Sequence, residues 1–323
     1  MKNVYTSSNI FLCFLVFISI QSNGEVFTSD KIYRKGNWNI GTSSLDTGID
    51  SQSEIIAGKR KLISDQFSFT EGPAVDKKGN VFFTDQPNDK IWKYDIYGKL
   101  SGFLDKTGRS NGLYFDKKGN LLACADEQNQ LWSINPEGKV KVLVKDFQGH
   151  KLNGPNDLWV NPKGGGIYFT DPYYQRPYWE RKKSDLDGEK VYFFKNKKLI
   201  AVAEDVVKPN GIIGTADGKY LYVADIGDNK TYRYTIHKDG TLINRQLFTE
   251  QGSDGMTIDN LGNIYLTGNG VTVYNPEGKK IEHISVPEDW TANACFGGKD
   301  RDTLFITASK SLYILPMKVR GVQ

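Results

Sequence analysis

Residues 70–85, TEGPAVDKKGNVFFTD, carry the pattern that decides the fold of this 323-residue chain. The polar residue Glu71 opens an apolar segment, the turn glycine Gly79 follows it, and the β-rich run VFFTD comes next. The same order recurs down the chain. The polar residue and the turn residue of the later copies are Asn111 and Gly119, Asn156 and Gly164, Asn210 and Gly218, Asp254 and Gly262, and, in a looser copy, Asn293 and Arg301.

Successive copies lie about 40–55 residues apart, which is the spacing of propeller blades. Between them, segments such as KIWKYDIYGKLSGF (90–103) read as strand, turn and strand, with the glycine that tight hairpins need. No stretch of a dozen residues has the apolar spacing of a helix. The sequence therefore predicts an all-β protein, a six-bladed β-propeller of four-stranded antiparallel blades.

Residues 25–323 are predicted to form a single propeller domain, with blades over about residues 54–320. A strand within Glu54 to Ile63 is expected to add to the last blade as its outer strand and so close the ring. The final run, SLYILPMKV (311–319), is expected to be a strand of that same blade.

The first residues form a separate pattern. Lys2 precedes an apolar stretch, Ile10 to Ile20, which is too short to span a bilayer. With the small residues that end at Gly24, it predicts a secretory signal peptide over residues 1–24, with an N-terminal strand as the alternative. We therefore expect an exported protein, periplasmic or secreted, without stable membrane insertion after cleavage.

Charge and cysteine usage exclude two classes of function. The formal charge of +4 falls to +3 without residues 1–24, which contain Lys2 and no acidic residue, and the lysines are scattered through turns, so nucleic acid is not an expected partner. Cys124 and Cys295 fall in different repeats, which favours buried free thiols, although export permits a disulfide. The absence of CxxC and of His/Cys clusters excludes the usual structural zinc site. Oligomeric state is not predicted.

The repeated polar residues are expected to converge. In a propeller the innermost strand of each blade lines a central channel, and equivalent positions lie at one mouth. The residues expected there are Glu71, Asn111, Asn156, Asn210, Asp254 and Asn293. Buried carboxylates need a partner, and a set of oxygen donors favours a hard divalent cation, Ca²⁺ before Mg²⁺ or Mn²⁺, whereas Zn²⁺ usually recruits histidine. His150, in GHKLNGPND (149–157), is the histidine nearest this mouth and is expected to support the site or face the substrate, with a surface histidine equally open.

Several motifs occur in an order that resembles a known family. They are FTEGPAVD, KLNGPNDLWV, FTDP, KPNGI, YVADIGDNKTYRY, SDGMTID and NACFGGKDRDTLFIT. Over about residues 54–318 the chain resembles the gluconolactonase and regucalcin-like (senescence marker protein-like) family of six-bladed sugar-lactone hydrolases. The resemblance implies one divalent cation held by Glu71, Asn156, Asn210 and Asp254, with Asp157 in support. Asn111 and Asn293 match the repeat without an implied metal role, and are expected to orient water or substrate hydroxyls at the mouth.

The implied reaction is the hydrolysis of a small sugar lactone. A cation at the lactone carbonyl acts as a Lewis acid while water attacks the polarised carbon. Asp254 is the candidate general base as well as a ligand, and a hydroxide held by the cation is the competing account. The long segment Pro172 to Glu189 is expected to be either a lid over the substrate or a surface excursion, and its aromatic residues either stack on a sugar or pack the loop. These aromatic residues are Tyr173, Tyr174, Tyr178 and Trp179.

Two other functions remain open at this stage. The same site suits a phosphoester or organophosphate hydrolase, and propellers also serve as non-catalytic binding platforms in which a metal is purely structural. A Ser-His-Asp mechanism has no support, because the chain has no GxSxG motif.

Overall fold

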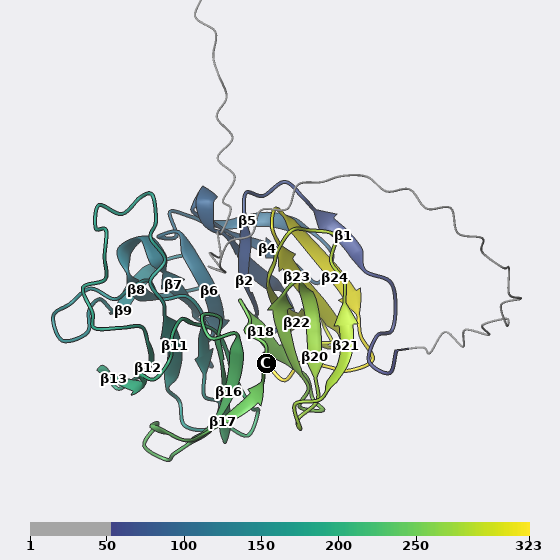
Figure 1. Cartoon of the computed structure of the whole chain (residues 1–323). Coiled ribbons are helices and arrows are strands. Elements are labelled where there is room, and N and C mark those ends of the chain that lie inside the picture. The colour runs from purple at the N-terminus through teal and green to yellow at the C-terminus, as the bar shows by residue number, and fades with distance from the viewer. Residues whose placement is uncertain (1–52) are drawn as a thin grey trace, which may run out of the picture. The chain divides into compact units, whose positions relative to one another are not determined.

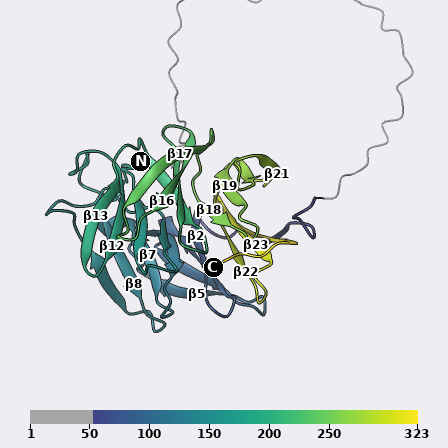
Figure 2. The ribbon, with the colours of Figure 1, turned by 90° about the horizontal axis from the view of Figure 1, so that it is seen from below.

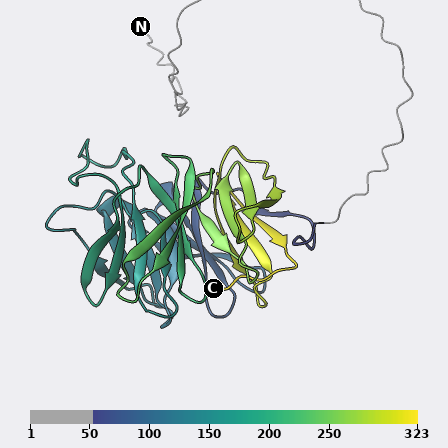
Figure 3. The ribbon, with the colours of Figure 1, turned by 60° about the horizontal axis from the view of Figure 1, so that its bottom comes forward.

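The computed structural model describes residues 53–323, so the predicted signal peptide, residues 1–24, lies outside the described residues. Residues 53–323 form six four-stranded antiparallel sheets arranged as a six-bladed β-propeller, which confirms the predicted fold. Figure 2, a view from below, shows the sheets arranged around a centre, with β2, β18 and β22 towards the inside. Figure 3 shows the blades from another side. Within the described residues, no helix is long and apolar enough to cross a membrane.

The first three blades follow one another along the chain, each from its inner to its outer strand. Blade 1 comprises β2 (Thr70–Val75), β3 (Val81–Asp85), β4 (Lys90–Tyr94) and β5 (Leu100–Asp105). Blade 2 comprises β6 (Ser110–Phe115), β7 (Leu121–Ala125), β8 (Gln130–Ile134) and β9 (Val140–Val144). Blade 3 comprises β10 (Leu158–Val160), β11 (Ile167–Asp171), β12 (Lys190–Lys195) and β13 (Lys198–Ala203). Short 3₁₀ turns, η1 (Gln86–Asn88) and η2 (Asp126–Gln128), follow the second strands of blades 1 and 2.

The remaining blades include the strand that closes the ring. Blade 4 comprises β14 (Pro209–Gly214), β15 (Tyr220–Asp225), β16 (Lys230–Ile236) and β17 (Leu242–Thr249). Blade 5 comprises β18 (Met256–Ile258), β19 (Ile264–Gly268), β20 (Gly270–Tyr274) and β21 (Lys280–Ile284). Blade 6 comprises β22 (Thr291–Gly297), β23 (Thr303–Ala308), β24 (Ser311–Pro316) and, from the start of the chain, β1 (Lys61–Ser64). As the sequence predicts, an N-terminal strand is therefore the outer strand of the last blade, with Lys61 opposite Ile314.

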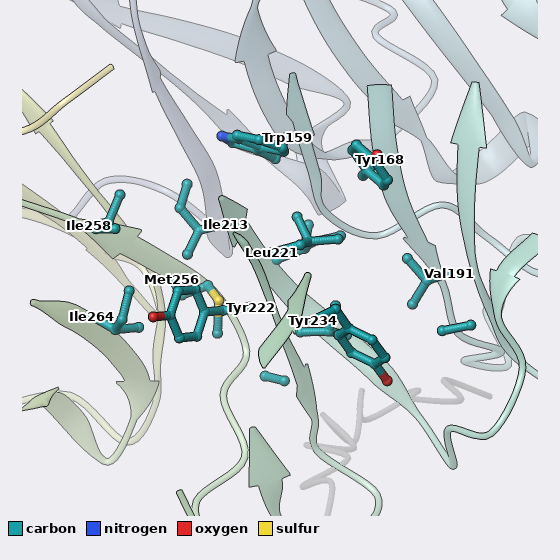
Figure 4. Close-up of a cluster of buried hydrophobic side chains, with 14 of the residues drawn as sticks. Trp159, Tyr168, Val191, Ile213, Leu221, Tyr222, Tyr234, Met256, Ile258 and Ile264 are labelled. Carbon is teal, nitrogen blue, oxygen red and sulfur yellow. The ribbon is translucent and has the colours of Figure 1, made fainter. Parts of the chain in front are cut away.

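Burial decreases from the inner to the outer strand of a blade. Every residue of β14 is buried, whereas β17 of the same blade is largely exposed. The apolar cores fill the spaces between neighbouring blades, and Figure 4 shows one in which residues of blades 3, 4 and 5 meet. Its labelled members include Trp159, Leu221 and Met256, one from each blade. This packing requires apolar residues on both faces of the second strands, so β3 (VFFTD) and β7 (LLACA) carry apolar side chains at consecutive positions.

The turn between the first two strands of blades 1, 2 and 5 is held by one recurring set of hydrogen bonds. In blade 1, Gly79 N–H donates to the Asp76 carbonyl, and the Asp76 carboxylate accepts from the backbone N–H groups of Lys78 and Asn80. Gly79 adopts φ +99°, a conformation that favours glycine. The repeat breaks in blade 3, where an extra residue makes Gly165, and not the predicted Gly164, the left-handed residue.

Both described cysteines are buried and free, as the sequence predicts. Cys124 lies in β7 and Cys295 in β22, each without solvent exposure. Burial raises the pKa of the Cys124 thiol well above its ordinary value, so the thiol stays protonated near neutral pH. These side chains therefore serve as small apolar core residues.

Candidate functional site

A polar cavity of about 240 Å³ lies where the inner strands of the blades begin. Five of the six repeated polar residues line it, namely Glu71, Asn111, Asn156, Asn210 and Asp254. Glu71, Asn111 and Asn210 are the second residues of β2, β6 and β14, while Asn156 and Asp254 lie two residues before β10 and β18. The other lining residues are Phe69, Gln86, Tyr174, Arg176, Ile226 and Trp290. The structure therefore brings the predicted positions of blades 1 to 5 to one place.

A glycine follows most of these residues because the inner strands approach one another closely. Glycine 72, next to Glu71, adopts φ +37°, and a Cβ atom there would lie 2.2 Å from the Asn111 carbonyl oxygen. A Cβ atom at Gly255 would overlap the Asn293 side chain at 1.9 Å. Both contacts are far shorter than real carbon atoms allow. Glu71 and Asp254 can therefore lie this close to the propeller axis only because a glycine follows each of them.

Aspartates at the ends of three second strands fix the segments that lead into the site. The Asp85 carboxylate accepts backbone hydrogen bonds from residues 68 and 69, at 3.1 and 3.2 Å. Asp171 accepts from the backbone N–H groups of residues 153 and 154, each at 2.8 Å, and Asp225 from those of residues 207 and 208, at 2.7 and 2.8 Å. These are blades 1, 3 and 4, the blades that carry Glu71, Asn156 and Asn210. Hydrogen bonds to a carboxylate are stronger than those between neutral groups.

Three buried side chains, Glu71, Asp157 and Asn293, form the base of the site. Asn293 Nδ2 donates to Asp157 Oδ2 at 3.2 Å and, more weakly, to Glu71 Oε2 at 3.4 Å. Burial raises the pKa of Asp157 to about 8, against the lowering effect of the Asn293 amide. Burial, and then the charge of Asp254, raise the pKa of Glu71 well above its ordinary value. The base therefore concentrates negative charge that needs a proton or a cation to balance it.

Asp254 lies in the cavity wall and is held by a tryptophan. Trp290 Nε1–H donates to Asp254 Oδ2 at 2.6 Å. Burial raises the pKa of Asp254 to about 6, and the hydrogen bonds from Trp290 and Asn210 oppose that rise. Asp254 is therefore still ionised at pH 7 while being more basic than an exposed aspartate.

Two amide oxygens of the cavity wall, Asn111 Oδ1 and Asn210 Oδ1, are buried without a hydrogen-bond partner. Asn210 Nδ2 donates to the Tyr174 hydroxyl at 3.1 Å, which leaves Oδ1 as the free atom. Buried polar atoms are normally paired, so unpaired oxygens beside carboxylates fit a site for a cation. In residues 53–323 no group of three or more His, Cys, Asp or Glu side chains is placed to share a metal ion, so a cation here would depend on the amide oxygens as well as the carboxylates.

The predicted loop, Pro172 to Glu189, is packed down onto blade 2 and contributes to the cavity wall. Arg176 Nε donates to Asp126 Oδ2 at 3.0 Å, and the Tyr178 hydroxyl donates to the same atom. Trp179 is buried, with its ring N–H on the carbonyl of residue 127. Of the four aromatic residues considered for stacking, Tyr174 alone lines the cavity, while Tyr178 and Trp179 hold the loop down.

Of the two interpretations left open for His150, the structure agrees with the surface histidine. His150 is exposed, exchanges backbone hydrogen bonds with Phe147 and does not line the cavity. His150 belongs to the turn that starts at Phe147, and this turn lies away from the cavity, although Asn156 is only six residues further along the chain. Asn293 does not line the cavity either. It is buried, and its side chain contacts Glu71 and Asp157.

Sequence reasoning missed Gln86, Arg176 and Trp290. Gln86 had a readable signal, because it follows the second strand of its blade at the same offset as Ile226, which also lines the cavity. Arg176 and Trp290 had none, because they come from connecting segments outside the repeat.

Comparison with known proteins finds relatives that match this chain over most of the propeller. Residues 69–310 match the sequence profile of the SMP-30/gluconolactonase/LRE-like region. A gluconolactonase of Zymomonas mobilis is 27% identical over 313 residues, covering 86% of this chain and 85% of that protein. A solved structure of a putative gluconolactonase superposes with a TM-score of 0.75 at 30% identity, covering 84% of this chain and 95% of its own. A gluconolactonase of Xanthomonas campestris superposes with a TM-score of 0.74 at 27% identity, covering 80% and 89%.

Proposed function

This chain belongs to the SMP-30/gluconolactonase/LRE-like family, and we propose that it is a lactonase that hydrolyses a small sugar lactone in the cavity at the channel mouth. The observation that carries the proposal is the convergence of Glu71, Asn156, Asn210 and Asp254 on one cavity. Its volume, about 240 Å³, is below the range of about 300–1,000 Å³ that is usual for drug-sized ligands and suits a single sugar ring. Similarity to gluconolactonases over most of the chain supports the same substrate class.

We further propose that one divalent cation, Ca²⁺ in the first place, binds to Glu71, Asn156, Asn210 and Asp254. The donors are all oxygen atoms, two of them carboxylates, which is the ligand set that hard cations prefer. The unpaired Asn210 Oδ1 and the raised pKa of Glu71 support this placement. When bound, such a cation would supply Lewis-acid polarisation of the lactone carbonyl.

Asp254 is the residue proposed to accept the proton of the attacking water. Without a cation, burial raises the pKa of Asp254 to about 6, and a cation bound to the same carboxylate would lower it again. The assignment therefore rests on the position of Asp254 in the cavity wall, where its second oxygen can accept a proton from water. The water oxygen bonds to the carbonyl carbon, the ring C–O bond breaks, and the ring oxygen takes up a proton. The products are a hydroxy acid, as its carboxylate, and one released proton.

Three further lining residues, Tyr174, Gln86 and Arg176, offer hydrogen-bond donors to the hydroxyls of a sugar. The Tyr174 oxygen already accepts from Asn210, so its own O–H is free to donate elsewhere. Gln86 Nε2 is buried without a partner, and Arg176 is the one basic residue that lines the cavity. These groups are proposed to orient the lactone with its carbonyl towards Asn210 and Asp254.

The proposal is tested by following acid release from glucono-1,5-lactone in a pH-stat. Purified protein is stripped with a chelator and then supplied with Ca²⁺, Mg²⁺, Mn²⁺ or Zn²⁺ in turn. Hydrolysis above the uncatalysed rate, lost with the chelator and restored by a cation, is expected. Cation binding without turnover of any of a panel of sugar lactones would instead favour a non-catalytic binding propeller, and turnover of a phosphoester alone would favour the other hydrolase class.

Export remains a proposal that rests on the sequence. Residues 1–24 have the charged start, apolar centre and small-residue end of a signal peptide. N-terminal sequencing of protein recovered from the periplasm or the medium is expected to begin at Glu25. A chain that retains Lys2 and stays with the cytoplasmic fraction would contradict export.

A further inference from the structure

Trp290 is an exposed tryptophan whose side chain is nonetheless fixed in place. It directly precedes β22 of blade 6, and its backbone N–H donates to Ser309 Oγ at 3.3 Å, while Ser309 Oγ donates to the Trp290 carbonyl at 3.2 Å. These bonds tie Trp290 to the turn between β23 and β24 of its own blade. Trp290 is 37% exposed and is one of the residues that line the cavity.

The indole ring of Trp290 reaches from blade 6 to blade 5. A Cβ atom at Gly268, at the end of β19, would lie 3.8 Å from the ring, so the ring lies beside a residue that has no side chain. The Nε1–H of the same ring donates to Asp254 Oδ2 at 2.6 Å. The ring therefore spans the gap between two blades, and its polar end meets the carboxylate in the cavity wall.

This contact fixes one oxygen of Asp254. A carboxylate that accepts an N–H bond at Oδ2 cannot rotate freely about its Cβ–Cγ bond, so Oδ1 keeps a defined direction relative to the cavity. Small misplacements of a reacting group cost rate steeply, about a hundredfold for a displacement of about 1 Å. Trp290 is one of the residues that line the cavity, and an indole ring has an apolar surface about the size of a sugar ring.

We propose that Trp290 is the positioning residue for Asp254 and that its ring is the surface against which the sugar ring of the lactone packs. The proposal deepens the proposed lactonase function and rests on it for the second part. The first part, the hold on Asp254, rests on the hydrogen bond and the cavity geometry alone.

The test separates the N–H group from the ring. Trp290→Phe keeps an aromatic surface and removes the donor, so kcat is expected to fall about tenfold or more while KM changes by less than about threefold. Trp290→His restores a ring N–H and is expected to recover part of kcat, and Trp290→Ala is expected to raise KM as well. The matched control is Trp92→Phe in β4, which does not line the cavity and is expected to keep wild-type kcat and KM. Wild-type kcat in Trp290→Phe would overturn the proposal.

A second measurement needs no substrate. The indole N–H resonance that is missing from Trp290→Phe identifies Trp290 in the ligand-free protein, and it is expected to shift in Asp254→Ala, whose folding is checked by its melting temperature. An unchanged resonance would overturn the positioning role. If the wild type hydrolyses no lactone, the proposed function fails, and this resonance alone decides whether Trp290 holds Asp254.

Discussion

Asn293 donates its side-chain N–H to Asp157 Oδ2 at 3.2 Å, and the same nitrogen lies 3.4 Å from Glu71 Oε2. One amide from blade 6 thereby connects two buried carboxylates from blades 1 and 3. Its hydrogen bonds oppose the rise in pKa that burial causes at both carboxyl groups. This pair of carboxylates, of which Glu71 lines the cavity, therefore depends on a residue that does not itself line it.

Replacing Asn293 tests that dependence. Asn293→Ala removes the only side-chain donor of the pair among the described residues and is expected to lower the free energy of unfolding by about 1–3 kcal/mol, the usual cost of leaving buried polar groups unpaired. Asn293→Asp adds a third carboxylate and is expected to be more destabilising at pH 8 than at pH 5. Urea unfolding at both pH values measures the two variants. A change below about 0.5 kcal/mol in both, typical of ordinary surface substitutions, would contradict the account.

The metal-free protein is expected to lose stability as pH rises from about 5 to 8. The folded-state pKa of Asp157 is about 8 and that of Asp254 about 6, above the unfolded value of about 3.9. In this window the folded state binds more protons than the unfolded state, so the free energy of unfolding falls with rising pH. Melting temperatures with a chelator, at several pH values, measure the trend. Asp157→Asn is expected to flatten it, and an equally steep fall in that variant would rule out Asp157 as its source.

The repeats made most of the fold predictable. Each copy places a polar residue, a turn glycine and a second strand at matching offsets, so the six blades and the convergence of residues such as Glu71 and Asp254 follow from one periodic pattern. Trp290, Tyr174 and Arg176 belong to connecting segments, whose course depends on packing against a neighbouring blade. His150 is close to Asn156 in sequence but does not line the cavity, so proximity in sequence was not enough to predict a site residue.

The aspartates that end three of the second strands give a third prediction. Asp225 accepts two backbone hydrogen bonds at 2.7 and 2.8 Å from the segment before Asn210. Asp225→Asn keeps the shape but loses the charge and one acceptor, so the free energy of unfolding is expected to fall by about 1.5–3 kcal/mol and lactonase kcat to fall with it. The control Asp217→Asn changes an exposed carboxylate in the turn between β14 and β15 of the same blade and is expected to leave kcat unchanged. Equal kcat in both variants would refute the role of Asp225.

The loop between β11 and β12 gives a fourth prediction. Arg176 lines the cavity and is held by Asp126 at 3.0 Å, so Arg176→Gln is expected to raise KM by about tenfold, the scale of one charged hydrogen bond, with a smaller effect on kcat. Lys182→Gln, an exposed change in the same loop, is the control and is expected to leave KM unchanged. Initial rates over a range of lactone concentrations measure both. A KM for Arg176→Gln that equals that of the control would show that Arg176 does not contact the substrate.

The central claim is that the carboxylates of Glu71 and Asp254 make this cavity a lactonase site. It is tested most directly by pH-stat rates on glucono-1,5-lactone for the wild type, Glu71→Gln and Asp254→Asn, with circular dichroism and melting temperatures to confirm that each variant is folded. We expect both folded variants to lose at least about a hundredfold in kcat/KM, the scale at which enzymes lose a general base or an electrostatic stabiliser. Wild-type rates in both folded variants would contradict the account.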